Sequence, residues 1–524
     1  MSQLKILIEK LSKSSPEAVN TLNFDSSLFE YLHVVTKVEE KYLETLESNL
    51  NKKCIIFLSG SSGDGKSAII NKYISKYSPN YDFHVDATHS FAPQQTSIQA
   101  LDDSFDKYKN DDKSLVVGIN IGIMINYLYD GSETHSDIKK AIQSFLQKQA
   151  SNEEFHFINF EDYPKFEFSD KQIVVPFVQK ILAKITVESE SNPFYKAFIT
   201  DVNADTVSII HQNFKLLSKL EIQKSIIDLL ILVHFKYEQF ITARTLMDFV
   251  YILLKGPKLL VNQLFEETSN QIIQNIRKED PILNRTYPLD KFILECSTNK
   301  YDEDLNQFIN EFNSTCKEPM LSQSEPFTLL RMFFLLRNSV FSNNYHHKFQ
   351  NCFYSESIHS FIELISNHFN NDSKPIKAFY KELKNAILLY VNKKFPSLVS
   401  KNLLMLSYMK GTIIATPIEI REDINKIKNF QYETLTSFPL FLKVNDQEIN
   451  PLHVTFNMYQ LLLSLNSGFR PNKHDRNTIV LFEELIQSIL EIATKSKTLS
   501  IIKHTSQLDF KYIDDEIEVT KYDI

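Results

Sequence analysis

The chain has 524 residues, of which 43% are hydrophobic and 23% charged, and its formal net charge is −8 at pH 7. This length exceeds what one hydrophobic core supports, so we expect two to four globular domains, and the composition excludes a disordered protein. The negative charge excludes a protein that coats nucleic acid over its whole surface, although a local basic patch remains possible.

The apolar pattern argues against a membrane protein. No apolar run reaches the roughly 18 residues that cross a bilayer, and residues 1–19 lack the apolar core of a secretory signal. Four cysteines, Cys54, Cys296, Cys316 and Cys352, have no metal-binding spacing, which favours buried free thiols. We therefore expect a cytoplasmic protein that makes no membrane contact and holds no structural metal.

In chain order, residues 1–50 predict an N-terminal helical arm, in which Leu32, Val35, Val38, Tyr42 and Leu46 recur at roughly helical spacing. Short apolar runs at 54–59, 81–87, 114–121 and 154–160 predict strands, with helical patterns between them. Strands that alternate with helices are typical of a parallel α/β sheet flanked by helices. We assign this α/β domain to residues 51–200.

Beyond the α/β domain the strand signals fade. Residues 201–430 predict a large, mainly helical lid or interaction region. Residues 431–524 mix alternating and helical patterns, which predicts a small α+β C-terminal domain that ends in a hairpin.

The segment "GSSGDGKS" at residues 60–67 matches the phosphate-loop pattern G-x-x-x-x-G-K-S/T between a predicted strand and a predicted helix. Glycines let backbone N–H groups curl around phosphate oxygens at a helix N-terminus. We therefore predict a P-loop NTPase domain that binds ATP and Mg²⁺ through Gly60, Ser61, Ser62, Gly63, Asp64, Gly65, Lys66 and Ser67. Lys66 would reach the β- and γ-phosphates, and Ser67 would ligate magnesium.

Hydrolysis also requires an acidic residue at a strand end to hold the magnesium. Asp86 lies at the end of the second predicted strand and is our first choice, while Glu161 and Asp162 lie at the end of the fourth predicted strand as rivals. An acid at a strand end is also a common helix cap or turn residue, so both alternatives stay open.

Three further polar residues are candidates for catalysis. Asn120 follows the third predicted strand and is either a group facing the γ-phosphate or a turn asparagine beside Gly122. Arg244 lies in the first turn of a predicted helix capped by Thr242, a spacing that resembles a lid-helix arginine. Arg285 lies in a loop from which it could reach a nucleotide of its own or a neighbouring subunit. Ordinary salt bridges would explain either arginine.

Seven segments together resemble the DptF (DndF) family: "SPEAV", "YLHVVTKVEE", "SGSSGDGKS", "VDATHSFAPQQT", "INIGIMINYL", "FITARTLMDFVYILL" and "GFRPNKHDRNTIVLFEEL". The resemblance implies an ATPase-like component of bacterial phosphorothioation-dependent restriction, which acts with the partner proteins DptG and DptH against DNA that lacks the sulfur mark. His89 departs from this family's pattern, in which an acidic residue is expected, so no role in metal binding is carried to that position.

Two functions remain open, an ATP-hydrolysing motor or switch, and a nucleotide-dependent scaffold that recruits an effector with little turnover. A nuclease is not expected, because Asp372, Glu382 and Lys384 have the spacing of a solvated helix face. The pair His346 and His347 predicts a surface turn whose side chains point apart. DNA contact through local basic patches and formation of an oligomer are both compatible with the sequence.

Overall fold

The computed structural model describes residues 2–12, 26–90, 92, 94–149, 153–163, 165–169, 172–300, 302–316, 319–353, 356–430, 436–471, 476–503 and 506–523. The chain forms two compact units, the first from Met1–Glu167 with Val175–Tyr354 and the second from Phe168–Val174 with Ser355–Ile524. Across these described ranges, no helix combines the length and the apolar character needed to cross a bilayer.

A four-stranded parallel sheet forms the centre of the α/β part of the first unit. Its strands are β1 (Ile55–Ser59), β2 (Tyr81–His84), β3 (Ser114–Ile119) and β4 (Phe155–Asn159), and their order is β2-β3-β1-β4. Each predicted apolar run in this region contains one of these strands. The parallel sheet flanked by helices, predicted from the sequence, is therefore confirmed.

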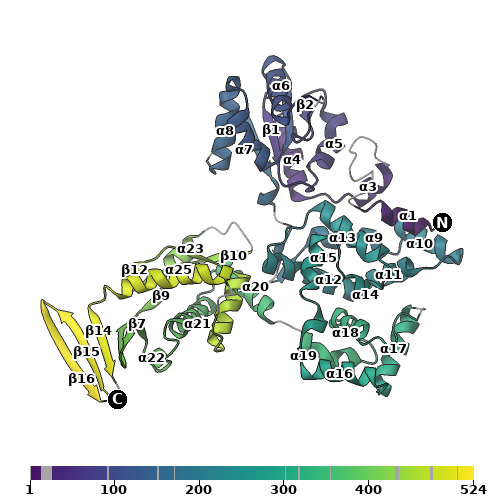
Figure 1. The fold of residues 1–524 in the computed structure, drawn as a ribbon. Helices are drawn as coiled ribbons and strands as arrows, with labels where there is room; N and C mark the ends of the chain where they lie inside the picture. Colours follow the sequence, from purple (N-terminus) through teal and green to yellow (C-terminus); the bar gives the residue numbers. More distant parts are fainter. Residues whose placement is uncertain are drawn as a thin grey trace. The chain divides into compact units, whose positions relative to one another are not determined.

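Helices cover both faces of this sheet because the side chains of a strand alternate between the two faces. Ile55 and Phe57 of β1 pack against α6 (Ser97–Asn110), α7 (Ile121–Asp130) and α8 (Ser136–Leu146). Ile56 and Leu58 pack on the other face against α4 (Lys37–Ser48) and α5 (Lys66–Tyr77). Figure 1 shows these helices around the sheet.

The N-terminal region differs from the predicted separate arm. It contains α1 (Gln3–Glu9), α3 (Ser26–Leu32) and α4, with non-helical residues 33–36 between the last two. Helix α4 buries Val38, Tyr42 and Leu46 in the core of the α/β part, so it belongs to that fold. Val35 is 47% exposed, because the helical period is broken there.

The rest of the first unit is helical, as the sequence predicts for most of it, and α1 packs against this body on α10 and α13. Its helices are α9 (Pro176–Thr186), α10 (Pro193–Asn203), α11 (Ile209–Leu217), α12 (Leu220–Tyr237), α13 (Ala243–Lys255), α14 (Leu260–Gln263), α15 (Gln271–Arg277), α16 (Tyr287–Ser297), α17 (Glu303–Cys316), α18 (Pro326–Leu335) and α19 (Gln350–Phe353).

The histidine pair lies in this helical body and corrects the predicted surface turn. His346 is 1% exposed, and its ring lies 5.5 Å from that of Phe308. The rings of His346 and His347 are 4.2 Å apart and both approach the carbonyl of Ser339, so they do not point apart. The prediction failed because a short 3-10 helix, Tyr345–Phe349, turns both rings toward the same carbonyl.

The second unit combines helices and antiparallel strands. Its helices are α20 (Glu356–Phe369), α21 (Ser373–Val391), α22 (Ser397–Ser400), α23 (Ile424–Asn429), α24 (Phe456–Asn466) and α25 (Arg476–Ala493). Its strands are β5 (Glu167–Ser169, whose first residue belongs to the first unit), β6 (Gln172–Val174), β7 (Leu403–Met409), β8 (Thr412–Pro417), β9 (Ile420–Glu422), β10 (Ser437–Leu440), β11 (Leu442–Val444), β12 (Gln447–Glu448), β13 (Leu452–Thr455), β14 (Thr498–Lys503), β15 (Ser506–Ile513) and β16 (Glu516–Asp523).

Five of these strands form one sheet in the order β16-β15-β14-β8-β7, and β15 and β16 form the expected terminal hairpin (Figure 1). Strands β7 to β9 lie within residues 201–430, which we expected to be mainly helical. The α+β part of the chain therefore begins earlier than predicted, at or before Leu403.

Candidate functional site

Residues 60–67, which we call the glycine-rich loop, connect β1 to α5 as the sequence predicts. Gly65 caps α5 with a φ of 102°, and Gly63 has a φ of 84°, both in the left-handed region that disfavours other residues. Lys66 and Ser67 are the first residues of α5, so their N–H groups belong to the helix end that lacks intrahelical acceptors. This end of a helix attracts anions.

Lys66 folds back over the glycine-rich loop. Its ammonium donates to the carbonyls of Gly60 and Ser61, each at 2.9 Å. Burial lowers the pKa of Lys66, an effect that the nearby charges of Asp64 and Asp86 oppose. The loop thus holds a desolvated cation beside the free N–H groups of a helix end, an arrangement suited to a phosphate group.

The sheet has a topological switch point at the same place. Strands β1 and β3 are neighbours, but α5 after β1 covers one face of the sheet and α7 after β3 covers the other. Parallel sheets bind ligands at such points, outside the carboxyl ends of the strands. The glycine-rich loop and Asn120 follow these two strands directly.

Asp86 is brought to this switch point by the chain after β2. The N–H of Ala87 donates to the carbonyl of Gly118 in β3 at 2.8 Å, which continues the pairing of β2 with β3. A side chain at Gly118 would collide with the carbonyl of Val85, so only glycine permits this approach. Asp86 and Lys66 consequently lie close enough for their charges to interact.

The Asp86 carboxylate already has protein partners. It accepts hydrogen bonds from the N–H and hydroxyl of Thr88, at 3.0 and 2.7 Å, and the His89 ring lies 3.3 Å away. Burial raises the pKa of Asp86, but these hydrogen bonds and the charges of His89 and Lys66 outweigh burial and lower it. The group is therefore an anion, as a magnesium ligand must be.

Glu161 and Asp162 lie on the other side of β1, in a 3-10 turn (Phe160–Asp162) that follows β4. Both side chains are exposed, and the N–H of Glu161 donates to the side chain of Asn159 at 3.3 Å. The two groups of candidate acids therefore lie on opposite sides of β1, the strand that leads into the glycine-rich loop.

Asn120 caps α7. Its side-chain oxygen accepts a hydrogen bond from the N–H of Ile123 at 2.8 Å. This oxygen has a local structural role as a helix cap, although the residue also lies at the switch point between β1 and β3. Among the described residues, none is recorded as an acceptor for its amide nitrogen.

Helix α13 begins against the glycine-rich loop. Thr242 caps it with a reciprocal pair of hydrogen bonds to Thr245, at 2.9 and 3.2 Å. The N–H of Arg244 donates to the carbonyl of Gly63 at 3.3 Å, and a Cβ at Gly63 would lie 3.2 Å from Arg244 Cβ. The structure thus places Arg244, with an exposed side chain, beside the loop.

Arg285 has a different environment. Its guanidinium is 78% exposed and donates to the carboxylate of Asp290, 3.1 Å away in the first turn of α16. This is the ordinary salt bridge that the sequence analysis kept as an alternative. No contact with the glycine-rich loop is recorded for Arg285 within the described part of the chain.

An ion pair at the glycine-rich loop was not predicted from the sequence. The Lys165 ammonium lies 2.9 Å from Asp64 Oδ1 and donates to the carbonyl of Ile241 at 2.8 Å. The Lys165 and Asp64 side chains are only 21% and 12% exposed. No local pattern marks this pair, because 101 residues separate its members.

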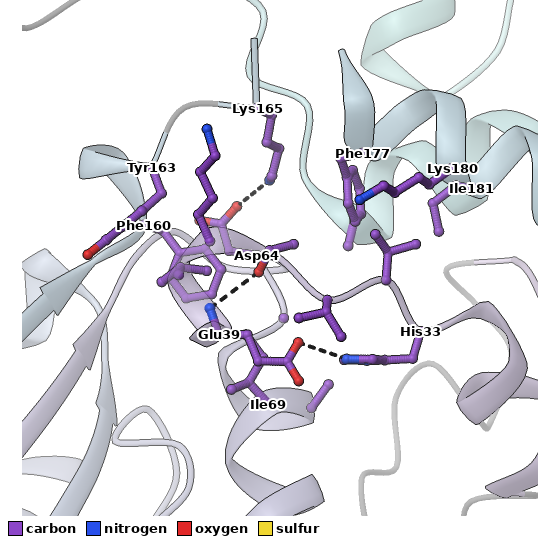
Figure 2. Close-up of a pocket in the computed structure, with 18 of the residues that line it drawn as sticks. His33, Glu39, Asp64, Ile69, Phe160, Tyr163, Lys165, Phe177, Lys180 and Ile181 are labelled. Atoms are coloured by element: carbon purple, nitrogen blue, oxygen red, sulfur yellow. Dashed lines mark hydrogen bonds and ion pairs between the residues drawn. The ribbon is translucent and has the colours of Figure 1, made fainter. Parts of the chain in front are cut away.

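A cavity of about 880 Å³ adjoins the glycine-rich loop at Asp64 and Gly65. Figure 2 shows Phe160 and Tyr163 on one side of it and Phe177, Lys180 and Ile181 of α9 on the other. The remaining apolar wall is formed by Leu32, Val34, Val35, Val38, Ile69 and Met247. The cavity is large enough for a small organic ligand.

Glu39 fixes one wall of this cavity. Its side chain is fully buried and binds Nε2 of His33, the ammonium of Lys72 and the hydroxyl of Tyr73, at 2.7 to 2.8 Å. Figure 2 shows the contact with His33. Burial raises the pKa of Glu39, but these three hydrogen bonds outweigh burial and lower it to about 2. A helical pattern alone gave no sign of this buried carboxylate.

The described residues contain no cluster of three or more His, Cys, Asp and Glu side chains that could hold a metal ion. The four cysteines, all within the described residues, form no disulfide, and Cys54, Cys296 and Cys316 are buried, as expected. Comparison of the chain with protein-family models, curated proteins and solved structures finds no match.

Proposed function

We propose that the chain is a P-loop NTPase that binds ATP with Mg²⁺ at the glycine-rich loop. The observation that carries this proposal is the position of Lys66, which is held by the loop carbonyls beside the N-terminus of α5. A bound nucleotide replaces these carbonyl contacts with its β- and γ-phosphates, while Ser67 and Asp86 supply magnesium ligands.

The cavity next to the loop supports a nucleotide over a simple phosphate. It shares Asp64 and Gly65 with the loop and continues into apolar walls that include Val35 and Phe177. A purine base is flat and largely apolar on its faces, so it suits such walls while its phosphates remain at the loop.

The resemblance to the DptF family gives this activity a setting. In this proposal the chain is a cytoplasmic component of a phosphorothioation-dependent restriction system and acts with proteins resembling DptG and DptH on DNA that lacks the sulfur mark. Nucleotide binding and hydrolysis then drive or switch the assembly, and other components cut the DNA.

A nucleotide-dependent scaffold with little turnover is the second candidate. The observation in its favour is that Thr88 and His89 already occupy the oxygens of Asp86. A metal ion bound there would compete with these contacts for the same two oxygens, which would slow assembly of a hydrolytic site. Steady-state ATP hydrolysis, measured with and without duplex DNA, separates the two functions.

The direct test of nucleotide binding is Lys66→Ala. This change removes the cation at the loop without opening a core cavity, so the protein should fold while Mg·ATP affinity or turnover falls at least about tenfold, roughly 1.4 kcal/mol. Lys76→Ala, in the last turn of the same helix and paired with Glu47, is the matched control. Equal ATP binding and turnover by folded Lys66→Ala and parent proteins would refute the assignment.

A further inference from the structure

Lys165 joins two parts of the chain that meet at the nucleotide site. Its ammonium contacts Asp64 in the glycine-rich loop and the carbonyl of Ile241 in the linker between α12 and α13. It comes from the segment that follows β4, so it belongs to neither of the elements that it connects. One cation therefore holds both the loop and the linker.

Asp64 places a negative charge within the glycine-rich loop, and Lys165 is its partner in an ion pair. Asp64 Oδ2 accepts a hydrogen bond from the N–H of Ser61 at 2.8 Å, so the carboxylate is built into the curl of the loop. Its charge acts on Lys66, the residue that would meet the phosphates. A carboxylate in this loop would repel a bound polyphosphate anion unless a cation compensates its charge.

The contact with Ile241 also anchors Lys165 next to the start of α13. The next residue, Thr242, caps α13, and the N–H of Arg244 donates to the carbonyl of Gly63. The loop and the start of α13 are thus joined twice, directly through Gly63 and Arg244, and indirectly through Lys165.

Resting on the proposed function, we propose that Lys165 is a positioning residue of the nucleotide site. Its ammonium cancels the charge of Asp64 beside the phosphates and fixes the start of α13 against the glycine-rich loop. Lys165 does not touch the reacting atoms in this role and acts through Asp64 and the α12–α13 linker.

This role predicts a particular pattern among variants. In Lys165→Met the Asp64 carboxylate loses its partner, and affinity for Mg·ATP, measured by calorimetry on the full chain, should fall about tenfold or more. Lys165→Arg keeps the charge and should bind within about threefold of the parent. Adding Asp64→Asn to Lys165→Met removes the uncompensated charge and should restore affinity at least about threefold.

Lys140→Met is the control. Lys140 is an exposed lysine of α8 that lies outside both the loop and the cavity lining, so its loss should leave Mg·ATP affinity unchanged. A Lys165→Met protein that binds within about twofold of the parent, or a double variant that binds no better than Lys165→Met, overturns the proposal.

A second measurement needs no nucleotide. Hydrogen exchange at the Arg244 amide reports the contact between α13 and the loop, and it should quicken in Lys165→Met but not in Lys140→Met. An unchanged exchange rate overturns the positioning of α13. If the parent binds no ATP, the proposed function itself fails, whereas normal binding by the parent and by Lys165→Met defeats this inference alone.

Discussion

Asp86 and the pair Glu161 and Asp162 compete for the same chemical role, and their surroundings differ. The carboxylate of Asp86 interacts with the charge of Lys66 and is 37% exposed, whereas the side chains of the pair are exposed in a turn on the far side of β1. An acid that shares a magnesium ion with Ser67 and phosphate oxygens has to lie near Lys66, and the charge of Asp86 does. This geometry favours Asp86 as the magnesium ligand.

The corresponding prediction is that Asp86→Asn abolishes metal-dependent ATP hydrolysis and leaves the protein folded, because an amide lacks the charge that Mg²⁺ requires. Glu161→Gln and Asp162→Asn serve as controls of the same chemistry and should retain most of the activity. Loss of hydrolysis in either control, with activity retained in Asp86→Asn, would assign the metal to the end of β4.

At the scale of secondary-structure elements, Glu39 connects α4 to α5, the helix that begins at Lys66. It receives Lys72 and Tyr73 from α5 and His33 from the segment before α4. The pKa of about 2 lies below the ordinary 4.5, so ionised Glu39 stabilises the fold above pH 4.5. This stabilisation is lost as the pH falls through about 2.

We predict that Glu39→Gln lowers the free energy of unfolding at pH 7 by an amount on the order of 3 kcal/mol. The difference between variant and parent should shrink below pH 4.5 and disappear near pH 2, which urea unfolding at several pH values measures. Glu47→Gln, on the same helix but 57% exposed, should have a much smaller effect. A deficit that stays constant over this pH range would contradict the prediction.

The elements of the α/β part were predictable because each buried strand is a continuous apolar run between polar or glycine residues. Ile55, Phe57 and their neighbours in β1 are fully buried on both faces, which gives the clearest signal. Strands β7 to β9 are only partly buried, so their apolar residues resemble those of the surrounding helices.

The candidate site was predictable only where it is local in sequence. The glycine-rich loop and the cap of α13 each follow from a few adjacent residues. The contacts of Lys165 with Asp64 and of Arg244 with Gly63 join distant segments, and a single sequence carries no pattern for them. The burial of Glu39 could not be predicted from the sequence either, because a glutamate in a helix is usually solvated.

At the scale of the whole molecule, the chain passes between the two units at 167/168, 174/175 and 354/355. The first of these crossings follows Lys165 by only two residues. The segment that carries Lys165 therefore continues directly into the second unit.

The net charge of −8 limits how the molecule can contact DNA. Only eight of its 57 basic residues are arginines, so a contact would depend on lysine-rich patches to the phosphate backbone. One such patch borders a hollow of about 590 Å³ in the second unit and includes Lys401, Lys495 and Lys497. Backbone contacts of this kind carry no base or sulfur recognition of their own.

We therefore predict that the isolated chain binds phosphorothioated and ordinary duplexes with affinities within about tenfold, and that added salt weakens both together. Replacing Lys401, Lys495 and Lys497 with glutamate should weaken binding to both duplexes and flatten the salt dependence, because fewer counterions are released. The same change at Lys374, Lys377 and Lys381 of α21 is the matched control. Tight, salt-insensitive binding that depends on the sulfur mark would instead place recognition of the mark in this chain and remove the need for a partner to supply it.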